Sequence, residues 1–309
     1  MFIYYFIIVV LSFSSIFFFQ KLFFSKKLYD DINNRSSHTS VATRSGGISI
    51  FSTIFILSFY SYIKGIEIYD FSLIVPLSIL VSIGLYDDIY KLDFKLKFIF
   101  QIIAAKIIID NGLIIDNLHG FFGIYEIGRL ASQVLTIFII VSIINAINFI
   151  DGVDGLAISV ILIFLTGFEF FASSQTPLFK LTVISILSII PLIYFNFKKD
   201  KKVFLGDSGS LFLGGLVSIY VIYILTNEYI IKEQFDVHKI LFVFSILSYP
   251  IIDIVRVVFN RILNGRSPFL ADKNHIHHKI LKNTKSHIST TILISLISMF
   301  LLILIQIIF

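Results

Sequence analysis

The chain has 309 residues, of which 57% are hydrophobic and only 15% are charged, and its mean hydropathy is +0.92. A soluble domain would carry about a quarter charged residues, so the composition excludes a soluble globular protein and indicates a polytopic membrane protein. Cysteine is absent, which excludes disulfides and thiolate metal sites. The net charge of +5 is interpreted as a consequence of membrane topology, and no nucleic-acid partner is expected.

Ten apolar runs are predicted to be membrane-spanning helices, since a span needs about 20 such residues. They lie at 1–24, 46–63, 71–86, 98–115, 130–147, 155–173, 178–197, 209–227, 239–260 and 288–309. The first run lacks a basic start and a cleavage site, so it is interpreted as a retained span and not as a signal peptide. We therefore expect an all-α fold with about ten transmembrane helices in a single integral domain, residues 1–309, because no polar stretch is long enough to fold alone.

The segments between these runs alternate in charge. One set holds 19 Lys and Arg residues and the other set holds five. Cytoplasmic loops carry the excess of Lys and Arg, so the first set is predicted to be cytoplasmic and both termini to lie outside. The first set comprises 20–45, 87–97, 148–155, 198–207 and 256–287.

Polar side chains recur at every third residue in the stretch NAINFIDGVDGLA, between two apolar runs. They are Asn145, Asn148, Asp151 and Asp154. Polar groups at a membrane edge are costly and rarely idle, and Gly152 and Gly155 would let the helix break so that these side chains converge. Oxygen ligands without Cys suit a hard cation such as Mg²⁺. A simple polar turn is the alternative, but it explains the four-fold recurrence poorly.

Two further acidic groups lie at the ends of predicted spans. Asp87 and Asp88 end the third span and are followed by three lysines, including Lys97. Adjacent carboxylates repel, so they need a metal, a shared proton or cations; taken alone, the pair is better explained as a solvated helix end. Asp207 follows Gly206 immediately before a span. It is either an N-cap or, with glycine amides beside it, part of a site for a metal-bound phosphate.

The last basic loop, NRILNGRSPFLADKNHIHHKI, contains His275, His277 and His278. An HxHH cluster could ligate Zn²⁺, but the sequence has no HExxH and no separate motif for a third ligand. Histidine beside arginine fits phosphate binding better, and contact of an exposed basic loop with anionic lipid stays open. Asp253 and Arg256, three residues apart in the ninth span, are expected to neutralise each other in a structural role.

Several of these groups lie on the cytoplasmic side in a topology that was inferred from charge alone: Asp87, Asp88, Asn148, Asp151, Asp154, Asp207 and the histidine loop. Carboxylates for a metal, cations for phosphates and a membrane-embedded position together indicate phosphoryl transfer to or from a membrane lipid. A transporter or flippase is a second hypothesis, but it predicts polar groups near the bilayer centre and repeat symmetry. A CDP-alcohol phosphotransferase is a third, but Ala157-Ile158 lacks the arginine usual in that class.

Five segments together identify a family. They are NRSSHTSVATRSGGISI, GLYDDIYKLDFKLKFIFQ, NAINFIDGVDGLA, VFLGDSGSLFLGG and PIIDIVRVVFNRILNGRSPFLADKNHIHHKI, in this order between residues 34 and 280. The chain resembles the polyprenyl-phosphate N-acetylhexosamine-1-phosphate transferases of glycosyltransferase family 4, relatives of the phospho-N-acetylmuramoyl-pentapeptide transferase. The HIHH loop and the short length resemble the branch that initiates sugar-lipids.

The resemblance implies transfer of a sugar-1-phosphate from a UDP-sugar to undecaprenyl phosphate, with release of UMP and a requirement for Mg²⁺ that Mn²⁺ could replace. It implies a bacterial inner-membrane enzyme with a cytoplasmic active site that initiates a surface glycan such as lipopolysaccharide O-antigen. Whether the protein is a homodimer stays open. By analogy, the metal ligands would be Asp207 and Asn148, and the catalytic groups would be Asp207 with Asp87 or Asp88. The nucleotide pocket would be formed by Asp151, Asp154 and Phe204. The phosphate or sugar would be contacted by Lys97, Arg266, His275, His277 and His278.

The first loop departs from the family pattern. Family members usually have Pro-Thr-Pro-Arg before the glycines, where this chain has Val41-Ala42-Thr43-Arg44. Loss of two prolines is expected to loosen this loop. The sequence leaves open which sugar is transferred and whether transfer is direct or passes through an aspartyl intermediate.

Overall fold

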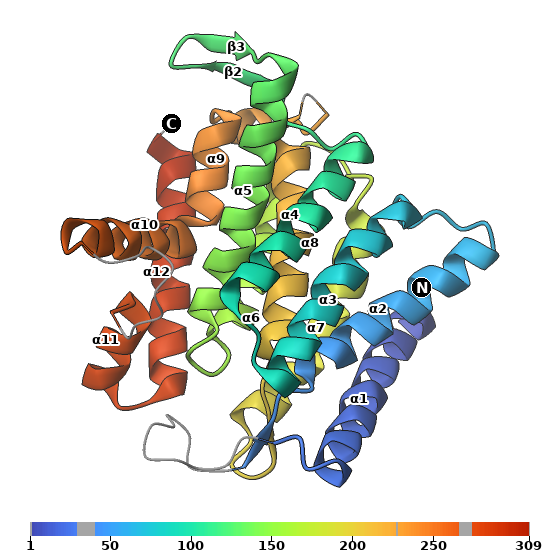
Figure 1. Ribbon diagram of the computed structural model, residues 1–309. Coiled ribbons are helices and arrows are strands. Elements are labelled where there is room, and N and C mark those ends of the chain that lie inside the picture. Colours follow the sequence, from blue (N-terminus) through green and yellow to red (C-terminus); the bar gives the residue numbers. More distant parts are fainter. Residues whose placement is uncertain (1, 30–40, 227, 266–273, 309) are drawn as a thin grey trace.

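The computed structural model describes residues 2–29, 41–226, 228–265 and 274–308, which form a bundle of helices (Figure 1). The α-helices are α1 (Phe2–Ser25), α2 (Gly46–Ile63), α3 (Ile74–Tyr90), α4 (Phe94–Asp110), α5 (Arg129–Ile150), α6 (Leu156–Phe171), α7 (Phe179–Phe197), α8 (Gly206–Leu225), α9 (Lys239–Ile246), α10 (Ser248–Leu263), α11 (Ile276–Thr284) and α12 (His287–Ile308). Short 3-10 helices are η1 (Phe71–Leu73) and η2 (Glu233–Phe235), and the strands are β1 (Ala42–Thr43), β2 (Asn117–Phe121), β3 (Ile124–Glu126) and β4 (Lys202–Val203). The predicted all-α class is confirmed.

Helix is present at each of the ten predicted spans, but not every helix is long enough to cross a bilayer. Within the described residues, seven helices are long and apolar enough, and the bent pair α9 and α10 would make an eighth if it is one span. The helices α4 and α6 have 17 and 16 residues, shorter than the span of about 20. The predicted number of ten is therefore somewhat too high, whereas the polytopic membrane class is confirmed.

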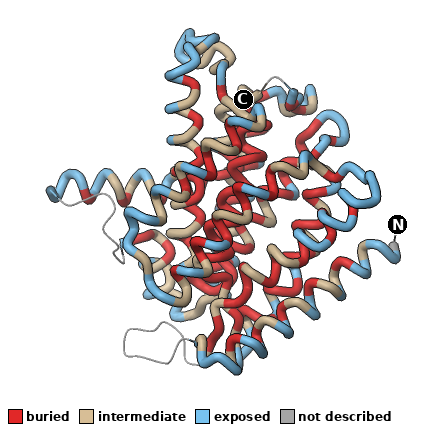
Figure 2. Tube along the Cα trace, turned by 45° about the vertical axis from the view of Figure 1, so that its right-hand side comes forward, coloured by how far each residue is buried: buried red, intermediate tan, exposed pale blue. Residues whose placement is uncertain are grey.

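Helix α8 lies at the centre of the bundle and packs against α2, α3 and α5. Its span is buried throughout, and Figure 2 shows buried residues filling the middle of the molecule. Glycines allow the close packing: a Cβ at Gly209 would lie 2.8 Å from the Cα of Gly47 in α2, and one at Gly214 would lie 2.7 Å from the Cα of Ile144 in α5. Small residues let helix backbones approach closely in membranes, so α8 is fixed tightly against its neighbours.

The contact between α2 and α8 gives a stability prediction. A methyl group at Gly47 would lie 2.0 Å from the backbone nitrogen of Gly209, so we expect Gly47→Ala to destabilise the fold by about 1–3 kcal/mol or more through overpacking. Thermal unfolding in detergent measures this. Gly128→Ala is the control, because a Cβ there meets no described atom within 4 Å and φ is −60°. Equal melting temperatures for the two variants would contradict this packing.

Two helix breaks shape the end of the bundle that carries the polar residues. Helix α5 ends at Ile150, and the chain turns as far as Gly155, which precedes α6 and has φ of +74°, a conformation that glycine adopts readily. The break predicted in this stretch is confirmed. Helices α9 and α10 meet at 83°, and Pro250 lies in the first turn of α10, where its missing N–H is tolerated.

Backbone hydrogen bonds hold the end of the first loop, where the two prolines are missing. Strand β1 pairs in parallel with β4, and the N–H of Phe204 donates to the carbonyl oxygen of Thr43 at 2.8 Å. Ala42 and Thr43 are fully buried. Backbone hydrogen bonds to β4 therefore restrain this segment, and the looser loop expected from the missing prolines stays a prediction.

Candidate active site

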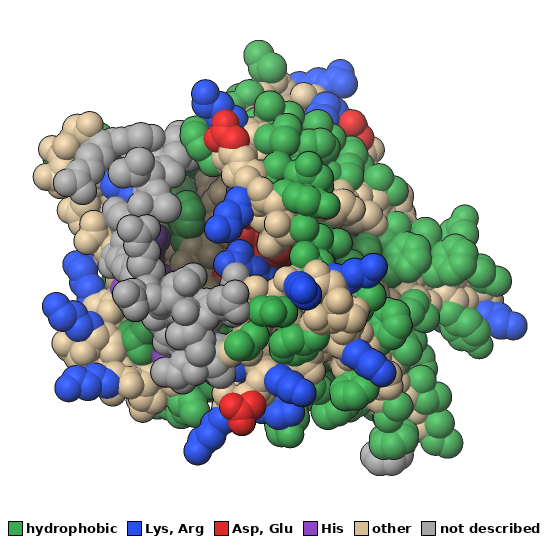
Figure 3. Space-filling model, turned by 60° about the horizontal axis from the view of Figure 1, so that its bottom comes forward, with side chains coloured by type: hydrophobic (Ala, Val, Ile, Leu, Met, Phe, Trp, Pro, Cys, Tyr) green, Lys and Arg blue, Asp and Glu red, His purple; other side chains and the backbone are tan. Residues whose placement is uncertain are grey.

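The described residues predicted for the site lie at or beside the end of the bundle where α3, α5 and α8 meet the β1–β4 pair. Figure 3 views the molecule from this end and shows Lys and Arg side chains around a hollow, with Asp or Glu and His side chains at its sides. Contacts between α3 and α8 and between α5 and α8 bring these segments together. The described face is therefore both basic at its rim and acidic within.

Asp207, in the first turn of α8, is the centre of a hydrogen-bond network. The Nζ of Lys97, from α4, donates to Oδ2 of Asp207 at 2.8 Å and to Oδ2 of Asp87 at 2.9 Å. The Nδ2 of Asn148, from α5, lies 3.3 Å from Oδ1 of Asp207 and 2.8 Å from Oγ of Ser210. Four helices thus contribute the polar groups around one carboxylate.

Asp88 has a different role from the adjacent Asp87. Helix α8 has no capping side chain of its own, and a helix N-terminus leaves backbone N–H groups without partners. The two oxygens of Asp88 accept from the N–H groups of Asp207 and Ser208, each at 2.9 Å. The side chain is 1% exposed and lies 3.7 Å from Arg44. Asp88 therefore holds the start of α8, and with it Asp207, in place.

The turn after α5 contributes two carboxylates in different surroundings. Asp154 is paired with Lys202, whose Nζ lies 2.5 Å from Oδ2, and its backbone N–H donates to Nδ1 of His287 at 3.1 Å. Burial raises the pKa of Asp151 well above its ordinary value, and the nearby carboxylate of Asp207 acts in the same direction. Asp154 is thus neutralised by Lys202, whereas burial favours the protonated, neutral form of the Asp151 carboxyl.

Sequence reasoning missed Lys202 and His287 as partners of Asp154. Lys202 belongs to a charged run, Lys198–Lys202, that was interpreted as topology, and His287 is an isolated histidine at the start of α12. Neither position carries a local signal. Asn145, in contrast, bonds to Gln101 of α4 at 2.7 Å, so it joins α5 to α4.

The donor set fits a hard divalent cation. Carboxylate and amide oxygens are the ligands that such a cation prefers, and the site supplies them from α3, α5 and α8. Lys97 and Arg44 interact with carboxylates of this group, and burial favours the protonated form of the Asp151 carboxyl. The carboxylates of this group are Asp87, Asp88, Asp151 and Asp207.

The predicted histidines form a second cluster with α10. The Nδ1 of His275 lies 2.6 Å from Oδ2 of Asp253, and the Nδ1 of His277 lies 3.0 Å from Oη of Tyr249. The expected pair between Asp253 and Arg256 is present at 3.2 Å, but Asp253 does more than neutralise it. Asp253, His275 and His277 are close enough to hold a metal ion; however, Arg256 and the hydrogen bonds already satisfy the carboxylate, so the geometry does not require one.

This histidine cluster packs on the turn that carries Asp151. A Cβ at Gly152 would lie 3.1 Å from Nε2 of His277 and 3.2 Å from Cε1 of His278, and the ring of Phe149 lies 5.5 Å from that of His275. The fold therefore brings the histidines and the carboxylate turn together. Arg266, which was predicted to contact phosphate or sugar, lies outside the described residues.

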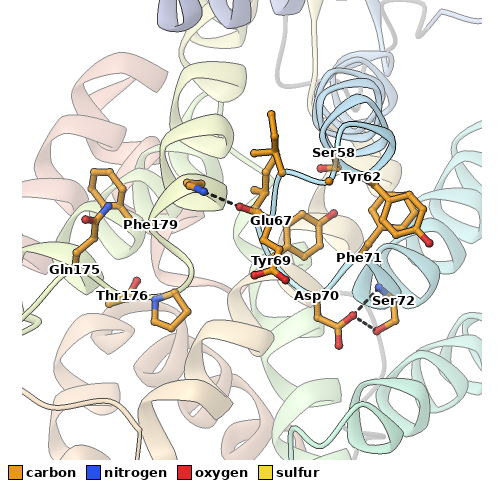
Figure 4. Close-up of a pocket in the computed structure, with 15 residues that line it drawn as sticks. Ser58, Tyr62, Glu67, Tyr69, Asp70, Phe71, Ser72, Gln175, Thr176 and Phe179 are labelled. Carbon is orange, nitrogen blue, oxygen red and sulfur yellow. Dashed lines mark hydrogen bonds between the residues drawn. The ribbon is translucent and has the colours of Figure 1, made fainter. Parts of the chain in front are cut away.

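A cavity at the opposite end of the bundle is separate from this site. It has a volume of about 1060 Å³ and lies between the α2–α3 and α6–α7 connections (Figure 4). Several of its polar groups are bonded within the protein: Asp70 accepts from Ser72, and Lys180 donates to the carbonyl oxygen of Glu67. None of the described residues predicted for the site lines it, so we assign it no part in the chemistry.

The fold and the site together define a polytopic membrane protein of the phosphotransferase class. Residues 70–225 match the model of glycosyl transferase family 4. A relative from Bacillus subtilis, named "Probable undecaprenyl-phosphate N-acetylglucosaminyl 1-phosphate transferase", is 33% identical over 87% of this chain and 74% of its own length. The chain belongs to glycosyl transferase family 4, which confirms the family predicted from the five segments.

Two further relatives carry similar names. The undecaprenyl-phosphate alpha-N-acetylglucosaminyl 1-phosphate transferase of Salmonella typhi is 31% identical over 82% of this chain and 69% of its own. The decaprenyl-phosphate N-acetylglucosaminephosphotransferase of Mycobacterium leprae is 30% identical over 85% and 72%. The region that matches the family model includes Asp87, Asn148 and Asp207 but not the histidine cluster.

Proposed function

We propose that the protein transfers an N-acetylhexosamine 1-phosphate from a UDP-sugar to undecaprenyl phosphate and releases UMP. The observation that carries this proposal is the network around Asp207, with Lys97, Asp87 and Asn148, in a chain whose relatives are named for such a transfer. N-acetylglucosamine is the sugar in each of those names, so UDP-N-acetylglucosamine is the first donor to test. The transporter and CDP-alcohol alternatives have no support among the relatives.

The chemistry follows from charge. An oxygen of the lipid phosphate attacks the β-phosphorus of the donor, and the bond from that phosphorus to the oxygen bridging to the α-phosphorus breaks, so that UMP leaves. A diphosphate and a cluster of carboxylates repel each other, so the donor can approach only with cations between them. Mg²⁺ held by Asp207 and Asn148 would neutralise the diphosphate as UMP leaves.

The chain's own residues prepare this step. Lys97 presents a positive charge between Asp87 and Asp207, where it can stabilise charge on the transferred phosphate. Asp88 fixes the start of α8. The proposal places this face in the cytoplasm, which the rim of Lys and Arg supports (Figure 3), and it places the protein in the inner (cytoplasmic) membrane of a bacterium, in keeping with its bacterial relatives.

An assay of UMP release tests the proposal. Purified protein is given undecaprenyl phosphate, Mg²⁺ and one UDP-sugar from a panel that includes N-acetylated and non-acetylated sugars. We expect UMP only when all components are present, with an N-acetylated donor giving the highest rate. EDTA should stop release, and Mg²⁺ or Mn²⁺ should restore it. No UMP from any donor would refute the function, and release that persists in EDTA would refute the metal requirement.

A further inference from the structure

Helix α11 is positioned by a carboxylate from another helix. It carries His277 and His278 in its first turn and begins without a capping side chain of its own. The N–H of Ile276, which opens the helix, donates to Oδ1 of Asp253 in α10 at 2.8 Å. A negative charge is favourable at a helix N-terminus, so Asp253 fixes where α11 begins.

The second oxygen of Asp253 holds the ring of His275. Its Oδ2 lies 2.6 Å from Nδ1 of His275, and because a carboxylate only accepts hydrogen bonds, Nδ1 carries the proton of this bond. Arg256 lies 3.2 Å from Oδ1 and balances the charge of a side chain that is 1% exposed. Both oxygens of Asp253 are thus committed to the segment His275–Ile276, at its ring and at its backbone.

His277 lies between His275 and the turn after α5 that carries Asp151. Burial, together with the neighbouring His278, lowers the pKa of His277 to about 3, so its imidazole is neutral. Its ring stacks on that of His275 at 5.3 Å. Its Nε2 has no hydrogen-bond partner among the described residues and lies beside Gly152. A buried polar atom without a hydrogen-bond partner is uncommon. A ligand bound between the histidines and this turn would supply a partner for Nε2 of His277.

We propose that Asp253 is a positioning residue for the transfer reaction: it sets the ring of His275 and the start of α11 so that His275–His278 meet the donor against the turn after α5. The proposal rests on the proposed function, which identifies the donor as a UDP-sugar. Asp253 acts through His275 and α11. The same device occurs at α8, where Asp88 caps the helix that carries Asp207. The starts of α8 and α11 are therefore each held by a carboxylate from another helix.

Asp253→Asn removes the charge and one of the two acceptor oxygens, so it cannot hold both His275 and Ile276. We expect the KM for the donor to rise about 10–100-fold, the range found when a partner that orients a functional histidine is removed. The KM for undecaprenyl phosphate should change less than about twofold. Asp70→Asn is the matched control, because Asp70 caps η1 through two hydrogen bonds at the other end of the bundle; both KM values should stay unchanged.

A double-mutant cycle with His275→Ala separates positioning from general stability. If Asp253 acts through His275 and the start of α11, the loss in the double variant should exceed that of His275→Ala but stay well below the product of the two single effects, whereas independent effects multiply. Multiplied effects, or an unchanged donor KM for Asp253→Asn, would overturn the proposal. These kinetic outcomes apply only if the wild-type protein turns over a donor.

Amide hydrogen exchange provides a readout that needs no substrate. The peptide covering α11 should exchange faster in Asp253→Asn than in the wild type, while peptides of α8 exchange equally in both. If the wild type releases no UMP from any donor, the proposed function fails, and this exchange result alone decides whether Asp253 positions α11. Unchanged exchange in α11 would refute that.

Discussion

Asp207→Asn is expected to reduce UMP release at least about a thousandfold, the upper range for loss of one electrostatic group at a transition state, while the protein still inserts and folds. Asp207 accepts a hydrogen bond from Lys97, and its Oδ1 lies 3.3 Å from Nδ2 of Asn148. It therefore connects the lysine to Asn148, the other predicted metal ligand. Asparagine has nearly the same shape, but it carries no charge and is a much weaker ligand for a hard cation. Initial rates at saturating donor measure the loss.

Asp200→Asn is the control for this variant. Asp200 lies on the connection just before α8 and is exposed, so removing its charge should leave the rate unchanged within about twofold. Substantial activity of Asp207→Asn, with normal insertion, would remove Asp207 from the chemistry.

Lys97→Met is expected to lower kcat about 100- to 1000-fold. The Nζ of Lys97 lies within 2.9 Å of carboxylate oxygens of Asp87 and Asp207, so its loss leaves two carboxylates without the ammonium between them. The Mg²⁺ dependence should change as well. Without the lysine the carboxylate cluster is more negative and should bind Mg²⁺ more tightly, so the Mg²⁺ concentration for half-maximal rate should fall. Rates measured across a Mg²⁺ titration give both quantities.

The neighbouring lysine provides the comparison for Lys97→Met. Lys95 is exposed in the first turn of the same helix, and Lys95→Met should change neither kcat nor the Mg²⁺ dependence. If Lys97→Met kept its kcat, or needed more Mg²⁺ than the wild type, the assigned position of Lys97 between the carboxylates would be wrong.

The sequence predicted those parts of the fold that depend on local pattern. Apolar runs locate the helices, and the two glycines after α5 predict the break that Gly155 makes with φ of +74°. The three-residue spacing of Asp253 and Arg256 predicts their contact, which is present at 3.2 Å. The number of full spans was overestimated because an apolar run does not reveal that α4 and α6 are short or that a helix bends by 83° between α9 and α10.

The geometry of the site could be predicted only in part. Sequence and family resemblance bring Asp87, Asp88 and Asp207 to one place, but they do not show that Asp88 has both oxygens on backbone N–H groups of α8. In this case the capping carboxylate and the N–H groups that it accepts from are more than 100 residues apart in the chain. No periodic sequence pattern therefore predicts the contact. The pairing of Lys202 with Asp154 is hidden for the same reason, since a lysine in a basic loop is the ordinary sign of topology.

The path of one phosphorus atom tests the central proposal most directly. UDP-N-acetylglucosamine labelled with ³²P at the β-phosphate is incubated with the protein, undecaprenyl phosphate and Mg²⁺, and lipid and water phases are separated. Transfer of sugar-1-phosphate predicts that the label enters the lipid in equal amount to the sugar, with unlabelled UMP in the water phase. If the label stays in the water phase as UDP while sugar enters the lipid, or if neither reaches the lipid, the proposed reaction is wrong.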